Sequence, residues 1–180
     1  MSLGDDRYEK IPIGFAFPYQ GEIWRDVFVN ANGNLTFGTG STDWTESVPD
    51  LLNGPARIAA LWDDLIQDED SVIKVTHKKN SVTIEYNNMG EFWTGDRNTF
   101  SITLYQSGKV EIVYGDCQSD DGLAGISQGN SAADPGPTDL SAAEKLSVSG
   151  TAYEIFTLDS NPDNDFDLSN KNLRFSVPEL

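Results

Sequence analysis

The chain has 180 residues, and its 29 acidic side chains outnumber its 12 basic ones, which gives a formal charge of −17 at pH 7. Hydrophobic residues make up 38% of the sequence, so a folded core is expected and an intrinsically disordered chain is excluded. The acidic balance argues against nucleic acid as a partner, because binding to phosphate backbones needs clustered lysine and arginine. No apolar run approaches the roughly 20 residues of a membrane-spanning helix, so membrane insertion is not expected.

The N-terminal residues are not typical of a targeting signal. Residues 1–6 have neither the basic region nor the apolar stretch of a signal peptide, and residues 1–4 are interpreted as a linker or an added start. No repeat or long linker divides the rest of the chain. We therefore predict a single domain over residues 1–180 that forms part of a larger protein.

Short runs of alternating apolar and polar residues recur along the chain and predict strands. In chain order, the expected strands cover residues 10–17, 26–31, 34–37, 58–62, 72–76, 82–86, 99–105, 108–114, 123–127, 153–158 and 172–177. Turn residues predict three antiparallel hairpins, at Asn32-Gly33, at residues 77–80 and at residues 106–108. Asn-Gly favours a type I′ turn, in which both central residues have positive φ.

Helices are expected to be short. Single helical turns are predicted at residues 48–52 and 140–145, and no long amphipathic helix is indicated. About 10 to 12 short strands without long helices predict an all-β fold, an antiparallel, jelly-roll-like β-sandwich. The apolar strand that ends at Trp62 is expected to lie centrally in its sheet.

Residues able to perform nucleophilic catalysis are scarce. His77 is the only histidine and Cys117 the only cysteine, so an internal disulfide is excluded and a nucleophilic triad is not expected. A pair of carboxylates in one cleft, as in a jelly-roll glycosidase, remains the catalytic option. Glu85 and Glu111 lie on polar strand faces, and we interpret them as surface residues. Catalysis is therefore the weakest of the functional hypotheses.

Two acidic loops carry the oxygen donors that calcium prefers. The first loop follows the apolar strand of residues 58–62, and the second precedes the last strand. The candidate ligands are Asp63, Asp64, Asp68 and Asp70, with Glu69 beside them, in the first loop, and Asp159, Asn161, Asp163 and Asp165 in the second. The two loops are alternative sites, and a solvated acidic loop without calcium is the competing interpretation of each.

Neither loop follows a known calcium pattern completely. In the second loop, Asn164 and Asn170 stand where an EF-hand has its turn glycine and its bidentate glutamate. In the first loop, adjacent Asp63 and Asp64 on an extended backbone would point to opposite faces, so at most one of them joins a given site. Their carboxylates could instead accept backbone N–H groups of the following loop.

Aromatic residues suggest a second kind of ligand. Trp44, Trp93 and Tyr105 could form a platform on which a sugar stacks, although packing in the core or at its rim is the alternative. The charge is concentrated late in the chain, because residues 116–170 contain eleven acidic residues and one basic residue. An acidic face formed by the later loops is therefore expected, suited to cations or to a basic partner.

Five segments in family order resemble the nidogen-type extracellular domain and its bacterial secreted relatives. They are IGFAFPYQG at residues 13–21, VFVNANGNLTFG at 27–38, RIAALWDDL at 57–65, the hairpin of residues 98–114, and AGISQGN at 124–130. Residues 172–175 resemble the closing strand. Ala60 departs from the proline common in the family, and the cysteines of animal members are missing, which favours a bacterial-type module.

The resemblance implies a β-sandwich module of secreted or cell-surface proteins and supplies no catalytic residue. Our first hypothesis is a non-catalytic extracellular interaction or architectural module, with adhesion as a suggested role. Its partners would be a protein or glycan and the neighbouring domains of the parent chain. The second hypothesis is a calcium- or carbohydrate-binding module, with Ca²⁺ as the sole candidate cofactor, and the third is a glycan-processing enzyme.

Overall fold

The computed structural model describes residues 1–142, 145–148, 150–158, 161 and 164–176. Within these ranges it has thirteen strands and one short helix. The elements are β1 (Tyr8–Tyr19), β2 (Glu22–Asn30), β3 (Asn34–Thr36), α1 (Val48–Asn53), β4 (Arg57–Trp62), β5 (Leu65–Ile66), β6 (Val72–Lys78), β7 (Ser81–Glu91), β8 (Arg97–Tyr105), β9 (Val110–Cys117), β10 (Gly122–Ser127), β11 (Lys145–Ser147), β12 (Ala152–Phe156) and β13 (Asn172–Ser176).

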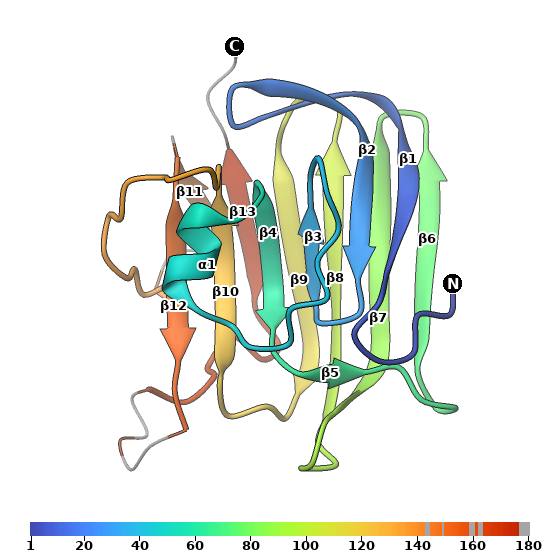
Figure 1. Cartoon of the computed structure of the whole chain (residues 1–180), viewed down its shortest axis with the longest axis vertical. Helices are drawn as coiled ribbons and strands as arrows, with labels where there is room; N and C mark the ends of the chain where they lie inside the picture. The colour runs from blue at the N-terminus through green and yellow to red at the C-terminus, as the bar shows by residue number, and fades with distance from the viewer. Residues whose placement is uncertain (143–144, 149, 159–160, 162–163, 177–180) are drawn as a thin grey trace.

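The strands form two sheets that pack face to face as a sandwich (Figure 1). One sheet has the order β1-β2-β3-β4-β10-β12, and the other has the order β11-β13-β9-β8-β7-β5, with β6 also paired to β7. The neighbouring strands run antiparallel, except that β11 and β13 run parallel. The predicted β-sandwich is confirmed, with one parallel pair at an edge.

The core follows from the alternation of the sequence. In β7, Val82, Ile84 and Tyr86 are fully buried, and the same pattern recurs in β8 and β9. Such period-2 burial places one face of each strand against the opposite sheet and leaves the other face toward solvent. The hairpins β6–β7 and β8–β9 form at the predicted turns.

The outer face of β4 is also covered. α1 begins after Ser47, whose side chain accepts a hydrogen bond from Asp50 N, and it packs Leu51 against Trp62 in a second, smaller core. Every residue of β4 is buried, and the strand lies between β3 and β10. The expected central position of the strand that ends at Trp62 is therefore confirmed.

The β2–β3 turn differs from the expected type I′ turn. The connection spans residues 31–33, and among them only Gly33 has a positive φ, of 70°. A Cβ atom on Gly33 would lie 1.8 Å from Leu61 O, so this position requires glycine. The side chain of Asn32, 2% exposed, points inward and forms hydrogen bonds that an exposed turn residue would not make.

Three local features were not expected from the sequence pattern. The short strands β5 and β11 have too few residues to show a period, and Lys145 begins β11 instead of ending a helical turn. The segment of residues 1–4, interpreted as a linker, packs into the domain through Leu3, which is 5% exposed. Gln67 holds this segment, because its Oε1 accepts a hydrogen bond from Leu3 N at 2.6 Å.

Candidate functional site

Carboxyl groups gather at one end of the sandwich, where β4 ends, β5 crosses and the β7–β8 turn projects, at the bottom of Figure 1. We call this set the acidic edge. Its members are Asp5, Asp6, Glu46, Asp63, Asp64, Glu91 and Asp121. None of them belongs to the ion pairs seen among the described residues. Among the described residues, the carboxyl groups of the acidic edge therefore have no direct ion pair with a lysine or arginine.

An inner cluster lies at the end of β4. Asp63, Glu91 and Asp121 each offer an oxygen atom, and these atoms all lie within 4.8 Å of one another. Asp63 follows β4 and is only 6% exposed, Glu91 ends β7, and Asp121 directly precedes β10. The cluster thus joins the two sheets, because β4 and β10 belong to one sheet and β7 to the other.

Ser119 bridges two carboxyl groups of this cluster. Its Oγ lies 2.7 Å from Asp63 Oδ2 and 2.5 Å from Glu91 Oε2. A hydroxyl group carries one hydrogen, so it can donate to only one of the two oxygens. The other contact is favourable when that carboxyl group is protonated and donates to the Ser119 oxygen.

The electrostatics of the inner cluster agree with that geometry. Burial, with smaller contributions from the charges of Asp63 and Asp121, raises the pKa of Glu91 to about 7, although the hydrogen bond from Ser119 acts in the opposite direction. Burial also raises the pKa of Glu46 to about 7, with the same two aspartates adding to the shift. The pKa of Asp121 is raised by burial and by Asp63. The charges of Asp63 and Asp121 therefore disfavour the ionisation of Glu91 and Glu46.

An outer cluster lines a small pocket beside the inner one. Asp5, Asp6 and Asp64 offer oxygen atoms that all lie within 4.8 Å of one another. The pocket has a volume of about 180 Å³, and it is lined by these three residues together with Trp44, Phe92 and Trp93. Burial raises the pKa of Asp64 to about 6, and the charges of its acidic neighbours add to the effect.

Asn32 ties together the segments that build this pocket. Its Nδ2 donates to Asp6 Oδ1 at 2.8 Å and to Asp43 O at 3.2 Å, next to Trp44. Its Oδ1 accepts a hydrogen bond from Leu65 N at 3.1 Å, next to Asp64. One buried amide therefore positions the N-terminal segment, the segment before α1 and the start of β5.

Comparison with known protein families identifies a family for this chain. A family described as NIDO related matches residues 1–176. The chain belongs to the NIDO-related family. No match was found among curated proteins or among solved structures. The family fits an extracellular module in general. Across the described residues of this NIDO-related domain, no helix is long and apolar enough to cross a membrane.

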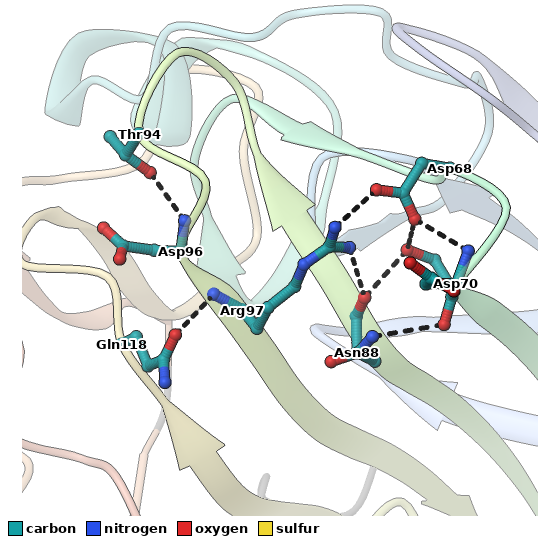
Figure 2. Close-up of polar contacts among 8 residues, drawn as sticks. Asp68, Asp70, Asn88, Thr94, Asp96, Arg97 and Gln118 are labelled. Atoms are coloured by element: carbon teal, nitrogen blue, oxygen red, sulfur yellow. Dashed lines mark hydrogen bonds and ion pairs between the residues drawn. The ribbon is translucent and has the colours of Figure 1, made fainter.

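In the NIDO-related domain, the candidate calcium ligands of the first acidic loop do not lie together. Asp63 joins the inner cluster and Asp64 the outer one, which confirms that these neighbours point apart. Figure 2 shows that Asp68 instead pairs with Arg97, whose Nη2 lies 2.8 Å from Asp68 Oδ2. Asp68 Oδ1 also accepts hydrogen bonds from Ser71 Oγ and from Asp70 N. The hydrogen bond from Arg97, helped by these two, lowers the pKa of Asp68 to about 2, although burial acts to raise it.

Backbone atoms of this loop and of its neighbour Asn88 form further hydrogen bonds. Asn88 Nδ2 donates to Asp70 O at 3.2 Å, and Arg97 Nη1 donates to Asn88 O (Figure 2). The side chain of Glu69 is exposed. The loop is thus held by its own hydrogen bonds and by Arg97, and it does not gather its carboxylates around one point.

Two members of the second candidate loop, Asp159 and Asp163, lie outside the described residues. Asn161 is exposed, and its carbonyl oxygen accepts a hydrogen bond from Asn164 N at 3.0 Å. Asp165 is half-buried.

The remaining residues singled out in the sequence lie in different parts of the domain. Trp44 and Trp93 line the pocket of the outer cluster, whereas Tyr105 lies elsewhere and donates a hydrogen bond to Glu111. Glu111 also pairs with Arg174 at 2.6 Å. Cys117 is buried and donates its S–H group to a backbone carbonyl, and burial raises its pKa to about 11.

Several residues of the acidic edge were not found by sequence reasoning. Glu46 and Glu91 have no acidic residue directly beside them in the sequence, and Asp121, which follows Asp120, is not next to any of the residues that it meets in the inner cluster. Ser119 and Asp63 are 56 positions apart. The pairing of β4 with β10 brings their segments together. Sequence reasoning could have found this contact only if the order of strands in the sheet had been known.

Proposed function

We propose that the chain is a non-catalytic extracellular interaction module that binds its partners through the acidic edge. Membership of the NIDO-related family supports an extracellular module. The observation that carries the proposed binding surface is a set of carboxylates without ion pairs beside two exposed tryptophans, Trp44 and Trp93. Such a combination favours binding to a basic surface, because charge complementarity steers association and exposed aromatic residues supply contact area.

The arrangement of the acids supports binding over catalysis. A glycosidase needs two carboxyl groups that face a substrate across an open space. Between Asp63 and Glu91 the Ser119 hydroxyl is in contact with both carboxyl groups. A panel of chromogenic glycosides tests this point. We expect no turnover by the wild-type protein, and turnover abolished by Glu91→Gln would contradict the proposal.

A matched pair of charge reversals tests the binding surface. Asp64 lies on the acidic edge, and Glu22 is an exposed acid in the β1–β2 hairpin at the opposite end of the sandwich (Figure 1). Wild type, Asp64→Lys and Glu22→Lys are immobilised at equal density and exposed to conditioned medium from the source cells. We expect quantitative mass spectrometry to show proteins that Asp64→Lys loses and Glu22→Lys retains. Equal capture by all three would contradict the proposal.

Calcium binding is a second candidate function, favoured by the inner cluster. Calcium takes roughly six to eight oxygen ligands, and carboxylates can supply two each. One oxygen atom each of Asp63, Glu91 and Asp121 lies within 4.8 Å of the other two, and the Ser119 hydroxyl contacts both Asp63 and Glu91. A bound Ca²⁺ would offset the repulsion among Asp63, Glu91 and Asp121, which adds to the effect of burial on the pKa of Glu91.

Thermal unfolding in calcium and in chelator tests this second candidate. Binding to the native state alone stabilises it by about 2.7 kcal/mol when calcium is at 100 times its Kd. The wild-type Tm should therefore rise with millimolar calcium, Asp121→Asn should lose most of the rise, and Glu22→Gln should keep it. An unchanged wild-type Tm would exclude a tight calcium site in the inner cluster.

A further inference from the structure

The pocket of the outer cluster exposes two indole rings. Trp93 is 92% exposed and Trp44 is 54% exposed, and both line the pocket. Large aromatic side chains that remain in water offer apolar area whose burial is favourable, so clustered exposed tryptophans mark binding surfaces more often than isolated ones do. Phe92 supports Trp93 from the side, with ring centroids 4.8 Å apart in an edge-to-face contact.

The pocket is also strongly negative. Its other three lining residues are Asp5, Asp6 and Asp64, and no lysine, arginine or histidine lines it. Burial, together with the repulsion of their acidic neighbours, raises the pKa of Asp64 to about 6 and raises the pKa of Asp5. A ligand with a positive charge would relieve this repulsion, and a neutral ligand would not.

The walls of the pocket are held before any ligand binds. Phe92 N donates to Asp64 O at 2.8 Å, which connects the β7–β8 turn to the segment between β4 and β5. Asn32 fixes Asp6 and the backbone beside Trp44, as described above. A preformed site loses less conformational entropy on binding than a flexible one.

Three kinds of ligand can be compared against these walls. Free Ca²⁺ would use the carboxylates but would gain nothing from the indole rings. A neutral sugar would stack on the rings but leave the three carboxylates repelling one another. A cationic side chain uses both, because its charge pairs with carboxylates and also lies favourably over the face of an aromatic ring.

We infer that this pocket binds a lysine or arginine side chain presented by a partner protein. The inference rests on the proposed function, since it names the chemistry of the partner that the acidic edge would recognise. Trp44 and Trp93 flank the side chain, and Asp5, Asp6 and Asp64 receive its positive charge.

The probe is a blocked Gly-Lys-Gly peptide, compared with Gly-Arg-Gly and with an uncharged Gly-norleucine-Gly peptide of similar length. Titration is followed by tryptophan fluorescence and by calorimetry. We expect saturable binding of the two cationic peptides, with the norleucine peptide at least about tenfold weaker, and affinity that falls as salt is raised. Equal affinity for the norleucine peptide, or no saturable binding of either cationic peptide, would overturn the inference.

Variants locate the binding. Trp93 has a φ of 72°, which glycine adopts without strain, so Trp93→Gly removes the indole without disturbing the turn. We expect Trp93→Gly and Asp64→Asn each to weaken the lysine peptide about fivefold. Ile23→Ala and Glu22→Gln, both at exposed residues of the opposite end, should bind as the wild type does. Wild-type affinity in Trp93→Gly would contradict the assignment of the pocket.

The same peptides and variants distinguish competing ligands, and they distinguish failure of this inference from failure of the proposed function. If calcium chloride or a monosaccharide saturates the pocket and the lysine peptide does not, the inference is overturned. If no cationic peptide binds but Asp64→Lys still loses partners from conditioned medium, this inference fails and the proposed function stands. If the peptide binds but the capture is unchanged by Asp64→Lys, the pocket stands and the proposed function fails.

Discussion

Replacement of Asn32 by alanine should destabilise the domain and loosen its acidic edge together. The side chain is 2% exposed and forms three hydrogen bonds, two donated by Nδ2 and one accepted by Oδ1. A typical hydrogen bond contributes about 0.5–1.5 kcal/mol net, and one to a charged group about 1.5–3 kcal/mol. Only the bond to Asp6 has a charged acceptor, and Asp6 is half-buried, so its contribution belongs at the low end.

The groups that lose Asn32 are not left without partners. Asp43 O keeps the hydrogen bond from Trp62 Nε1 at 3.1 Å, and Leu65 N keeps its bond to Asp63 O at 2.8 Å. The full penalty for an orphaned buried group therefore does not apply. Summing the three bonds at the low end of their ranges gives a loss of about 2.5 kcal/mol for Asn32→Ala.

Urea unfolding, followed by the fluorescence of the tryptophans, measures this loss from the midpoint and slope. Asn32→Asp is the matched variant. It keeps the acceptor for Leu65 N but places a second carboxylate oxygen against Asp6 and Asp43 O. We expect it to lose at least as much stability as Asn32→Ala, because the new carboxylate faces Asp6 Oδ1 and Asp43 O, the two atoms to which Asn32 Nδ2 donates in the wild type. A loss below about 0.5 kcal/mol for Asn32→Ala would refute the reasoning.

Three further predictions concern the rest of the fold. Gly33→Ala should cost more than about 3 kcal/mol in urea unfolding, because its Cβ would overlap Leu61 O, whereas Gly21→Ala, with an open environment at φ +80°, should cost about 1 kcal/mol; equal losses would contradict this. The pKa of Glu154 is raised by burial to about 7, above its unfolded value, so its stabilising contribution is present in acid and is lost as the pH rises through about 7. The wild-type Tm should therefore fall between about pH 5 and 8 more steeply than that of Glu154→Gln, and parallel curves would exclude this role. Cys117, with its pKa raised to about 11, should react with a thiol reagent far faster in urea than in the native state, and equal rates would show that it is accessible.

The strands and their buried faces could be predicted from the sequence because they depend on local alternation. Val82, Ile84 and Tyr86 show period 2 within one segment, and each is buried. The turn at Asn32 could not be assigned correctly in the same way. Its conformation depends on contacts of its side chain with Asp6 and Leu65, which are distant in the chain.

The acidic edge could be predicted only in part. Asp63 and Asp64 follow the apolar strand β4, and this position identified them as candidate ligands. The sequence could not show that Asp68, also a candidate ligand, forms an ion pair instead. Its partner Arg97 lies at the start of β8, far from Asp68 in the chain. Sheet order, and not acidic density along the chain, decides which carboxylates meet.

The most direct test of the acidic edge as a recognition surface is the indole region of a ¹⁵N-correlated NMR spectrum during titration with the Gly-Lys-Gly peptide. The chain has four tryptophans, and two of them, Trp44 and Trp93, line the pocket. Trp24 serves as an internal control, since its indole N–H donates to Tyr19 O outside the pocket. The account predicts that the signals of Trp44 and Trp93 shift with one shared dissociation constant while that of Trp24 stays in place. Unchanged signals for Trp44 and Trp93, or an equal shift of Trp24, would contradict it.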